Sequence, residues 1–296
     1  MGSKERIVVK DDPEGFVERA IARFIEKSPL NRRKVDNGRY FDPPLVGFAS
    51  GDDPLFTQYK RIIGKFHLTP REIFDLTFAR DEEAGRLSVI SWVIPISEDT
   101  RRSNRKGRGY PSLLWSHTRT FGEIFNVHLR DRVVSVLSDS GYRAVAPSNS
   151  PQFTPFRKGR KAGLASNWSE RHVAYACGLG TFGLSDGFIT PKGKAVRIGT
   201  VVTDLALSAS KKPYANHYAN CLHYSGGTCR ACASRCPAGA ITEGGHDKEK
   251  CREYQDKVVF PVKNPEYGVA IAGCGLCQTK VPCESAIPVK GPCSFR

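Results

Sequence analysis

The sequence has no apolar run close to the roughly 20 residues that a membrane-spanning helix requires. Its opening residues, MGSKERIVVKDDPEGF, lack the apolar core of a signal peptide. Paired arginines occur at residues 32–33 and 101–102, but no apolar stretch follows either pair, as a twin-arginine export signal would require. Internal repeats and long low-complexity tracts are also absent. These absences argue against a membrane span and predict a cytoplasmic globular protein.

What the sequence does contain is an ordinary globular composition with an unusual number of cysteines. The 296 residues are 40% hydrophobic and 25% charged, enough for one sizeable domain and a small one. Nine of the ten cysteines lie between Cys221 and Cys293. A reducing compartment disfavours structural disulfides, so clustered cysteines there more often bind metal or carry out chemistry.

The net charge of +15 is concentrated in short patches at residues 31–34, 100–110 and 156–163. Such patches are either solvated loops or docking surfaces for an acidic electron donor, a phosphate or tRNA. Charge alone does not choose among these alternatives.

Apolar periodicity and turn signals predict alternating helices and strands. Helical spacing covers residues 14–25, 55–66, 70–79, 120–140 and 169–177. Strand patterns cover residues 87–96, 143–146, 188–190 and 196–203, the last two joined by a turn at 191–193. The alternation favours an α/β domain. After about residue 205 the chain is rich in Cys, Gly and Pro, which is typical of a small domain organised by inorganic clusters.

The cysteine spacing is that of ligands for iron–sulfur clusters. Bacterial ferredoxins use C-x2-C-x2-C-x3-C-P, whose fourth cysteine binds the other cluster. The run CRACASRCP places Cys229, Cys232 and Cys236 in C-x2-C-x3-C-P, with the leading cysteine displaced to Cys221. A second group consists of Cys251 and the run CGLCQTKVPC, whose final gap is two residues longer than usual.

The ferredoxin crossover rule assigns these cysteines to two [4Fe–4S] clusters. Cluster A takes Cys221, Cys229, Cys232 and Cys283, and cluster B takes Cys236, Cys251, Cys274 and Cys277. Cys177 and Cys293 are left over, and the outer positions filled by Cys221, Cys251 or Cys293 stay open. Thiolates also bind zinc, so two zinc sites are the alternative.

Residues 178–183 match the dinucleotide motif G-x-G-x-x-G at Gly178, Gly180 and Gly183. That motif must follow a strand and open a helix, whereas here it follows a helical segment and leads towards a strand. The glycines are therefore interpreted as places where the backbone comes close to a flat cofactor or to a neighbouring chain segment.

Residues 169–205, SERHVAYACGLGTFGLSDGFITPKGKAVRIGTVVTDL, followed by CRACASRCPAGAI, resemble two related families. These are the cobalamin-dependent reductive dehalogenases and the epoxyqueuosine reductases. The resemblance is specific over residues 169–283 and weaker over residues 87–147. Both families join a cobalamin-binding, nitroreductase-like α/β domain to a two-cluster ferredoxin domain.

The resemblance implies an α/β (α+β) fold in three parts. Residues 1–80 would form an N-terminal helical extension, residues 81–205 the nitroreductase-like cobalamin-binding domain, and residues 206–296 the bacterial-ferredoxin-like domain. The implied cofactors are two [4Fe–4S] clusters and base-off cobalamin.

The resemblance also implies site residues. The candidates for proton donation are Tyr110 and Tyr175, with Arg171 or Arg197 as the basic partner. The residues implied to contact the cofactor are Gly178, Leu179, Gly180, Gly183, Phe188 and Thr190.

The sequence also departs from the family patterns. Epoxyqueuosine reductases carry a catalytic aspartate about six residues before a glutamate that corresponds to Glu170, and Leu164 occupies that position here. The C-terminal helical repeats that those enzymes use for tRNA, and the leader of respiratory dehalogenases, are not found. These departures disfavour tRNA as a partner.

Three hypotheses follow. The main one is an oxidoreductase that passes electrons from two clusters to a corrinoid and reduces a small organic molecule, with a low-potential ferredoxin or flavodoxin as donor. The second is a ferredoxin-type electron-transfer partner or corrinoid-reducing protein. The third is an epoxyqueuosine reductase acting on tRNA. The identities of the substrate and the electron donor, and the oligomeric state, are not determined by the sequence.

Overall fold

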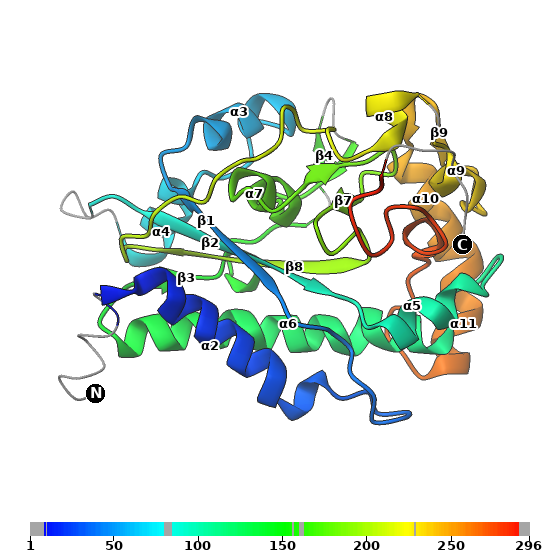
Figure 1. The fold of residues 1–296 in the computed structure, drawn as a ribbon, viewed down its shortest axis with the longest axis horizontal. Coiled ribbons are helices and arrows are strands. Elements are labelled where there is room, and N and C mark those ends of the chain that lie inside the picture. Colours follow the sequence, from blue (N-terminus) through cyan, green and yellow to red (C-terminus); the bar gives the residue numbers. More distant parts are fainter. Residues whose placement is uncertain are drawn as a thin grey trace.

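The protein is built around an antiparallel sheet. The computed structural model describes residues 9, 11–79, 85–155, 157–159, 163–227 and 229–289. Its main sheet has four strands in the order β1-β2-β8-β3 (Figure 1). The strands are β1 (Leu45–Ser50), β2 (Ser88–Pro95), β3 (Ala144–Val145) and β8 (Val196–Thr203). Every neighbouring pair is antiparallel, with Trp92 opposite Gly199 between β2 and β8.

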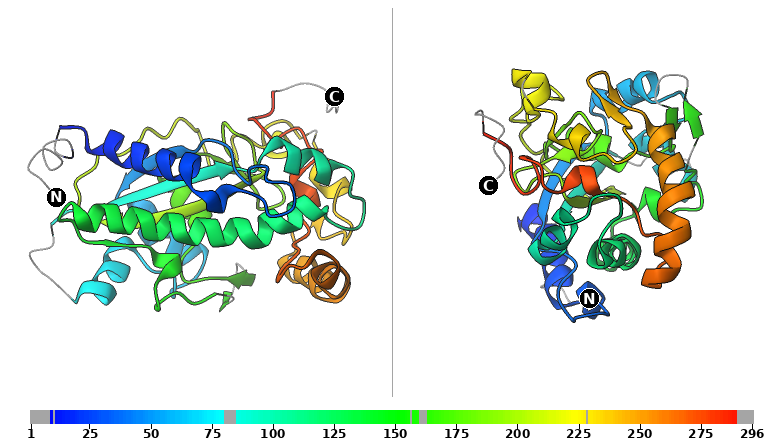
Figure 2. Two further views of the ribbon diagram at one scale, coloured as in Figure 1. Left: turned by 90° about the horizontal axis from the view of Figure 1, so that it is seen from below. Right: turned by 90° about the vertical axis from the view of Figure 1, so that its right-hand side faces the viewer.

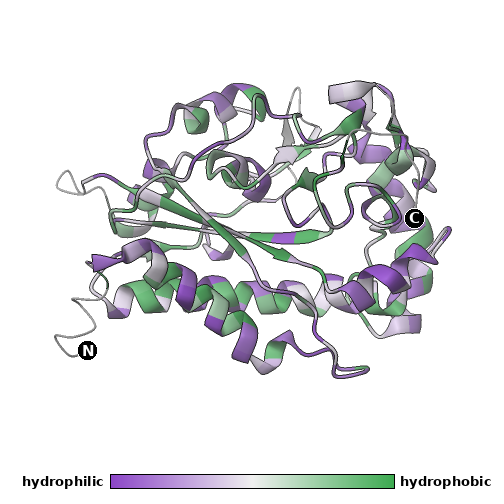
Figure 3. Ribbon diagram, in the orientation of Figure 1, coloured by the Kyte–Doolittle hydropathy of each residue, from purple (hydrophilic) through white to green (hydrophobic). Residues whose placement is uncertain are grey.

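Strand β2 is buried along its whole length because helices cover both faces of the sheet. Successive side chains of a strand point to opposite faces. Ile90, Trp92 and Ile94 therefore pack into one core, and Val89 and Val93 into the other. Figure 3 shows the central strands as mostly hydrophobic, whereas hydrophilic and hydrophobic residues alternate along covering helices such as α2.

One layer of helices covers each face of the sheet, and the helices of one layer are longer than those of the other. On one side lie α2 (Pro13–Lys27) and the long helix α6 (Leu113–Asp139), which run side by side in Figure 2. On the other side lie α3 (Pro54–Ile62), α4 (Pro70–Phe78) and α7 (Glu170–Ala176). Local sequence sets where these helices begin, since Asp12, Asp53 and Thr69 each accept a backbone hydrogen bond at an N-terminus.

The segment after β8 runs back along the exposed edge of β1. The backbone amide of Ser210 donates to the carbonyl of Phe48, and the Ser210 hydroxyl accepts from the Phe48 amide at 2.9 Å. Residues beyond the predicted boundary at 205–206 thus still pack on the sheet, and the three-part division stays a prediction.

Short elements form the remainder of the chain. They are η1 (Pro29–Asn31), α5 (Glu98–Arg105), η2 (Pro147–Asn149), β4 (Arg157–Gly159), β5 (Gly163–Ala165), β6 (Thr181–Phe182), β7 (Phe188–Ile189), α8 (Leu222–Gly226), α9 (Ala231–Ser234), β9 (Ile241–Thr242), β10 (Gly245–His246), α10 (Lys248–Tyr254), the π-helical turn η3 (Gln255–Val259), α11 (Phe260–Tyr267) and η4 (Leu276–Gln278). Elements α8 to α11 gather at one end of the sheet in Figure 1.

This C-terminal group is fastened to α5 and to the start of α6. The Arg105 guanidinium donates to both carboxylate oxygens of Glu284, with distances of 2.7 to 3.1 Å, and the Glu284 side chain is only 6% exposed. Arg235 donates to the carbonyl of Gly107 at 2.8 Å. The cysteine-bearing segments are therefore bonded to α5 and to the loop between α5 and α6.

Most predicted elements are present, with shifted ends. Helix α6 begins at Leu113 rather than at residue 120. Strand β1 and helix α5 were not predicted. Among the described helices, none has both the length and the apolar character needed to cross a membrane.

Candidate cofactor sites and the adjoining cavity

The first four-cysteine group surrounds a small cavity in the C-terminal part of the chain. The cavity is lined by Cys221, Cys229, Cys232 and Cys283. Cys221 caps α8, and Cys232 lies in the short helix α9. The buried side chains of Leu184 and Ile189 pack against this group from the β6–β7 region. The sequence-based assignment to cluster A thus corresponds to residues that lie around one cavity.

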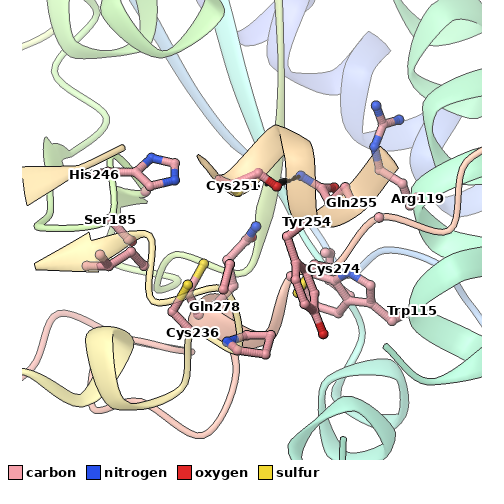
Figure 4. A pocket seen from close by; sticks show the side chains of 18 of the residues that line it. Trp115, Arg119, Ser185, Cys236, His246, Cys251, Tyr254, Gln255, Cys274 and Gln278 are labelled. Atoms are coloured by element: carbon pink, nitrogen blue, oxygen red, sulfur yellow. Dashed lines mark hydrogen bonds between the residues drawn. The ribbon is translucent and has the colours of Figure 1, made fainter. Parts of the chain in front are cut away.

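The second group lines a separate cavity of about 250 Å³. Its cysteines are Cys236, Cys251, Cys274 and Cys277. Figure 4 shows Arg119 and Trp115 on one side of this cavity and His246 and Ser185 on the other. The four residues are those assigned to cluster B, although Cys236 belongs to the first sequence motif.

The chemistry of these thiols fits a bound metal cluster. Burial raises the pKa of Cys274 to about 12 and the pKa values of Cys277 and Cys283 to about 11. Such thiols stay protonated at neutral pH unless a cation compensates the thiolate charge, and cluster iron would do so. Among the described residues, no group of three or more His, Cys, Asp or Glu side chains is placed to hold a single metal ion.

Nitrogen donors already point at two sulfurs of the cluster B group. The Ala240 amide donates to Cys236 Sγ at 3.3 Å, and Gln255 Nε2 donates to Cys251 Sγ at 3.6 Å. Gln255 starts the π-helical turn η3, a local irregularity that often marks functional sites. Hydrogen bonds to sulfur stabilise negative charge and so tune the potential of a cluster.

A larger cavity of about 600 Å³ adjoins the cluster B group. Its lining is aromatic and aliphatic on one side, with Tyr59 and Ile62 of α3 and Phe182 of β6, and polar at Gln58 and Lys248. Arg171 lines both this cavity and the cluster B cavity. Its volume lies within the range of small-molecule and cofactor sites, and its lining combines apolar side chains with several polar ones.

The candidate catalytic residues fall into two sets. Arg171 and Tyr175 lie four residues apart on α7 and both line the larger cavity. Arg197, on β8, lines the cluster B cavity. Tyr110 is not brought to these residues: it is 37% exposed between α5 and α6, where the ammonium of Lys263 lies over its ring.

The glycines of the motif at residues 178–183 let the chain pack closely against neighbouring segments. Gly178 has φ +74° after the end of α7, and an added Cβ would lie 2.3 Å from the carbonyl oxygen of Lys211. An added Cβ at Gly180 would lie 2.4 Å from the carbonyl oxygen of Ile189. Gly183 lines the cluster A cavity.

The other three residues predicted to contact the cofactor belong to the core. Leu179 and Phe188 lie in the apolar cluster beneath α7, and the Thr190 hydroxyl donates to the Gly193 carbonyl at 2.9 Å. These are contacts within the protein, and a contact of these three residues with a cofactor stays a prediction.

The carboxylate that borders the larger cavity is held in its ionised form. Burial opposes the charge of Asp186, but a hydrogen bond from His246, together with Arg171 and Lys248, lowers its pKa overall. Leu164, at the position where the resembling family has aspartate, lines the same cavity. A proton for a reaction in this cavity would therefore come from a group other than these two.

Several site residues had no signal in the sequence. Lys194 is 2% exposed and lines the cluster A cavity, and Arg119 lines the cluster B cavity. From the sequence alone, a lysine in a turn and an arginine in a helix are expected to be exposed to solvent. Their burial here depends on segments that are distant in the sequence. Cys293 and most of the basic patch at residues 156–163 lie outside the described side chains.

Two histidines anchor helix α7 at the edge of the larger cavity. The backbone amide of Ser169 donates to His67 Nε2 at 3.1 Å, so this ring nitrogen must be unprotonated. His172 Nδ1 lies 2.8 Å from the Ser169 hydroxyl. Burial, with the nearby charge of Lys60, lowers the pKa of His67 to about 4.

This anchoring predicts a loss of stability in mild acid. The unfolded chain takes up a proton at His67 near pH 6.5, whereas the folded chain does so only near pH 4. As the pH is lowered between these two values, the protonation of His67 in the unfolded chain should lower the free energy of unfolding by about 1.4 kcal/mol per pH unit. Urea unfolding at pH 7 and pH 5 measures it, and His67→Asn should flatten the dependence. Replacement of the exposed His128 by Asn is the control, and equal slopes in both variants would contradict the assignment.

The comparisons with known proteins lead to one enzyme name. No family model matches the chain. The chain is 31% identical over 119 residues to the epoxyqueuosine reductase of Bacillus cereus and 36% identical over 123 residues to that of Gloeobacter violaceus. Each match covers 38% of this chain, but only 29% and 35% of the two relatives. The matched segment thus spans about a third of their length.

The solved structures that match this chain are also of epoxyqueuosine reductases, and they match a larger part of the chain. A crystal structure of epoxyqueuosine reductase matches 97% of this chain and 68% of its own, with a TM-score of 0.53 and 17% identity. Another structure, of epoxyqueuosine reductase with an epoxyqueuosine-modified tyrosine tRNA stem loop, matches 92% of this chain and 67% of its own, with a TM-score of 0.49 and 17% identity. The first likeness shows that this chain has a mixed α/β fold similar to that of epoxyqueuosine reductase.

The comparisons contradict the expectation that disfavoured tRNA. The curated relatives that match this chain are named epoxyqueuosine reductases. The departures from the family pattern on which that expectation depended do not identify a substrate. The broader description as dehalogenase-like is not supported by these names.

Proposed function

We propose that this chain is an iron–sulfur and cobalamin-dependent reductase of the epoxyqueuosine reductase type, acting on a modified nucleoside in tRNA. The observation that carries the proposal is the arrangement of two four-cysteine groups, one of which adjoins the 600 Å³ cavity. The sequence and fold likeness to epoxyqueuosine reductases supports the choice of substrate.

Reduction of an epoxide to an alkene consumes two electrons and two protons and releases the oxygen as water. Cobalamin bound in the larger cavity would supply a strongly reducing cobalt centre. The chain would hold this cofactor between the apolar wall of α3 and the polar residues of α7, and Arg171 lies where the cavity meets the cluster B group. Two one-electron clusters match a reaction that needs two electrons.

Tyr175 is the proposed source of a proton. Its side chain lines the larger cavity, whereas Asp186 is held ionised and Leu164 has no proton to give. Arg171 lies on the same helix face and would stabilise the developing phenolate.

The surface around the larger cavity carries charge suited to a nucleic acid. Helix α3, which lines the cavity, contains Lys60 and Arg61 and is followed by Lys65, and Lys211 and Lys212 lie near its N-terminus. Lys60 pairs with Glu72 and Lys212 with Asp53, so the remaining charge of the patch comes mainly from Arg61, Lys65 and Lys211. Such a patch attracts the phosphate backbone without reading sequence.

The test uses the whole chain, reconstituted anaerobically with iron, sulfide and cobalamin. We expect a base-off cobalamin spectrum and, with a chemical reductant and tRNA carrying epoxyqueuosine, a product lighter by one oxygen on mass spectrometry. Unmodified tRNA is the control for binding and the free nucleoside the control for substrate size. Absence of cobalamin binding at tens of micromolar would overturn the cofactor assignment. Reduction of the free nucleoside but not of the tRNA would overturn the assignment of tRNA as the substrate.

A further inference from the structure

Lys194 is a fully buried lysine that the proposed reaction does not use. Its backbone amide bonds to the carbonyl of Cys283 at 2.8 Å, and its side chain is 2% exposed. The ammonium Nζ donates to the Ser185 hydroxyl at 2.6 Å. Burial opposes the charge of this ammonium, but the surrounding cysteine sulfurs, when ionised, raise the pKa of Lys194 overall.

The Lys194–Ser185 pair lies between the two cysteine groups. Lys194 lines the cluster A cavity, and Ser185 lines the cluster B cavity, where Figure 4 shows it beside His246. The sulfurs whose ionised forms raise the pKa of Lys194 belong to both groups, with Cys283, Cys232 and Cys221 from one and Cys277 from the other. Gly187 leaves room for it, because an added Cβ there would lie 2.6 Å from Lys194 Cε.

We infer that Lys194 is a positioning residue whose ammonium is the shared counter-charge of the two clusters, and that the Ser185 hydroxyl extends this effect to cluster B. The inference rests on the proposed function, since it requires that both groups hold clusters. It goes beyond that function by naming the residue that sets how readily the clusters accept electrons.

The physical reason is the charge that each reduction adds. A reduced cluster carries one more negative charge in a buried site, and a neighbouring reduced cluster repels it. A fixed cation between the two stabilises both reduced forms and weakens their mutual repulsion. The chain can then hold two electrons at once, which is the number that removal of an epoxide oxygen requires.

The experiment is a redox titration of the reconstituted chain followed by EPR, with iron and sulfide counted for each variant. Lys194→Met keeps the backbone bonds and the approximate volume but removes the charge. We expect at least a tenfold shift of the reduction equilibrium of the cluster A signal towards the oxidised form, which is 59 mV for a one-electron couple. The signal for simultaneous reduction of both clusters should shift further still. Lys192→Met, in the same turn but exposed, is the matched control and should change neither signal.

Ser185→Ala provides a second, milder variant. It removes the hydroxyl that joins the ammonium to the cluster B cavity, so we expect a shift of about two- to threefold in the cluster B equilibrium. Unchanged potentials in Lys194→Met with full iron content would overturn the inference. If that variant fails to assemble clusters, unchanged potentials in Ser185→Ala would overturn it. A wild-type chain without iron–sulfur clusters would instead refute the proposed function, so the two failures are distinguishable.

Discussion

Removing Cys232 together with Cys236 is expected to destroy both clusters, although the two cysteines belong to one sequence motif. The structure places Cys232 at the cavity with Cys221, Cys229 and Cys283, and Cys236 at the other cavity. Alanine at both positions therefore leaves each cluster with three ligands. Iron in the anaerobically purified chain should fall from about eight atoms towards zero.

The complementary double variant distinguishes this crossover from ligation by contiguous motifs. Cys232→Ala with Cys283→Ala removes two ligands from the cluster A group alone, so about four irons should remain. If each cluster were instead bound by the cysteines of one contiguous motif, replacing Cys232 and Cys236 would leave about four irons. Replacing Cys232 and Cys283 would then remove nearly all of the iron. Cys177→Ala is the control, because that buried thiol contacts the Val89 carbonyl and neither cysteine cavity, and it should leave the iron content unchanged.

Replacing Tyr175 with phenylalanine is expected to lower kcat for the reduction of epoxyqueuosine in tRNA about 100-fold, the usual contribution of a general acid. The substitution removes the hydroxyl but keeps the ring against Phe182. Iron content and cobalamin binding should not change, which separates a lost proton donor from a damaged site. Single-turnover reduction under anaerobic conditions measures the effect.

Tyr110→Phe is the matched control for this prediction. Sequence reasoning gave the two tyrosines equal standing, but the structure leaves Tyr110 at the surface beside Lys263. Its replacement should leave kcat within about twofold of the wild type. A large loss with Tyr110→Phe and none with Tyr175→Phe would contradict the placement of the reacting groups in the cavity beside α7.

The sequence predicted those helices, strands and ligand groups that are marked by a pattern within a few consecutive residues. Apolar spacing and Asp12 indicated α2, and the β-branched run closed by Pro95 indicated β2. The cysteine spacing indicated two groups whose members the structure brings together. In each case a period, a cap or a ligand motif acts over a few residues, so tertiary contacts were not needed to recognise it.

The missed features depend on contacts between distant segments. Strand β1 is short and contains Gly47, and it becomes a strand by pairing with β2 and the segment at Ser210. Lys194 appears in the sequence as a turn residue, and only the approach of the Cys283 segment buries it. The glycine motif follows helix α7, as the sequence predicted, but its packing partner Lys211 lies far along the chain. Long-range burial of this kind has no signature in one sequence.

The central claim is that eight cysteines hold two iron–sulfur clusters beside a cofactor cavity. Iron, sulfide and zinc counted on the same anaerobically purified wild-type chain, with Mössbauer spectra of the iron, test it most directly. The account predicts about eight irons and about eight sulfides per chain, all in [4Fe–4S] clusters. Zinc in their place, or a single cluster's worth of iron after full reconstitution, would contradict it.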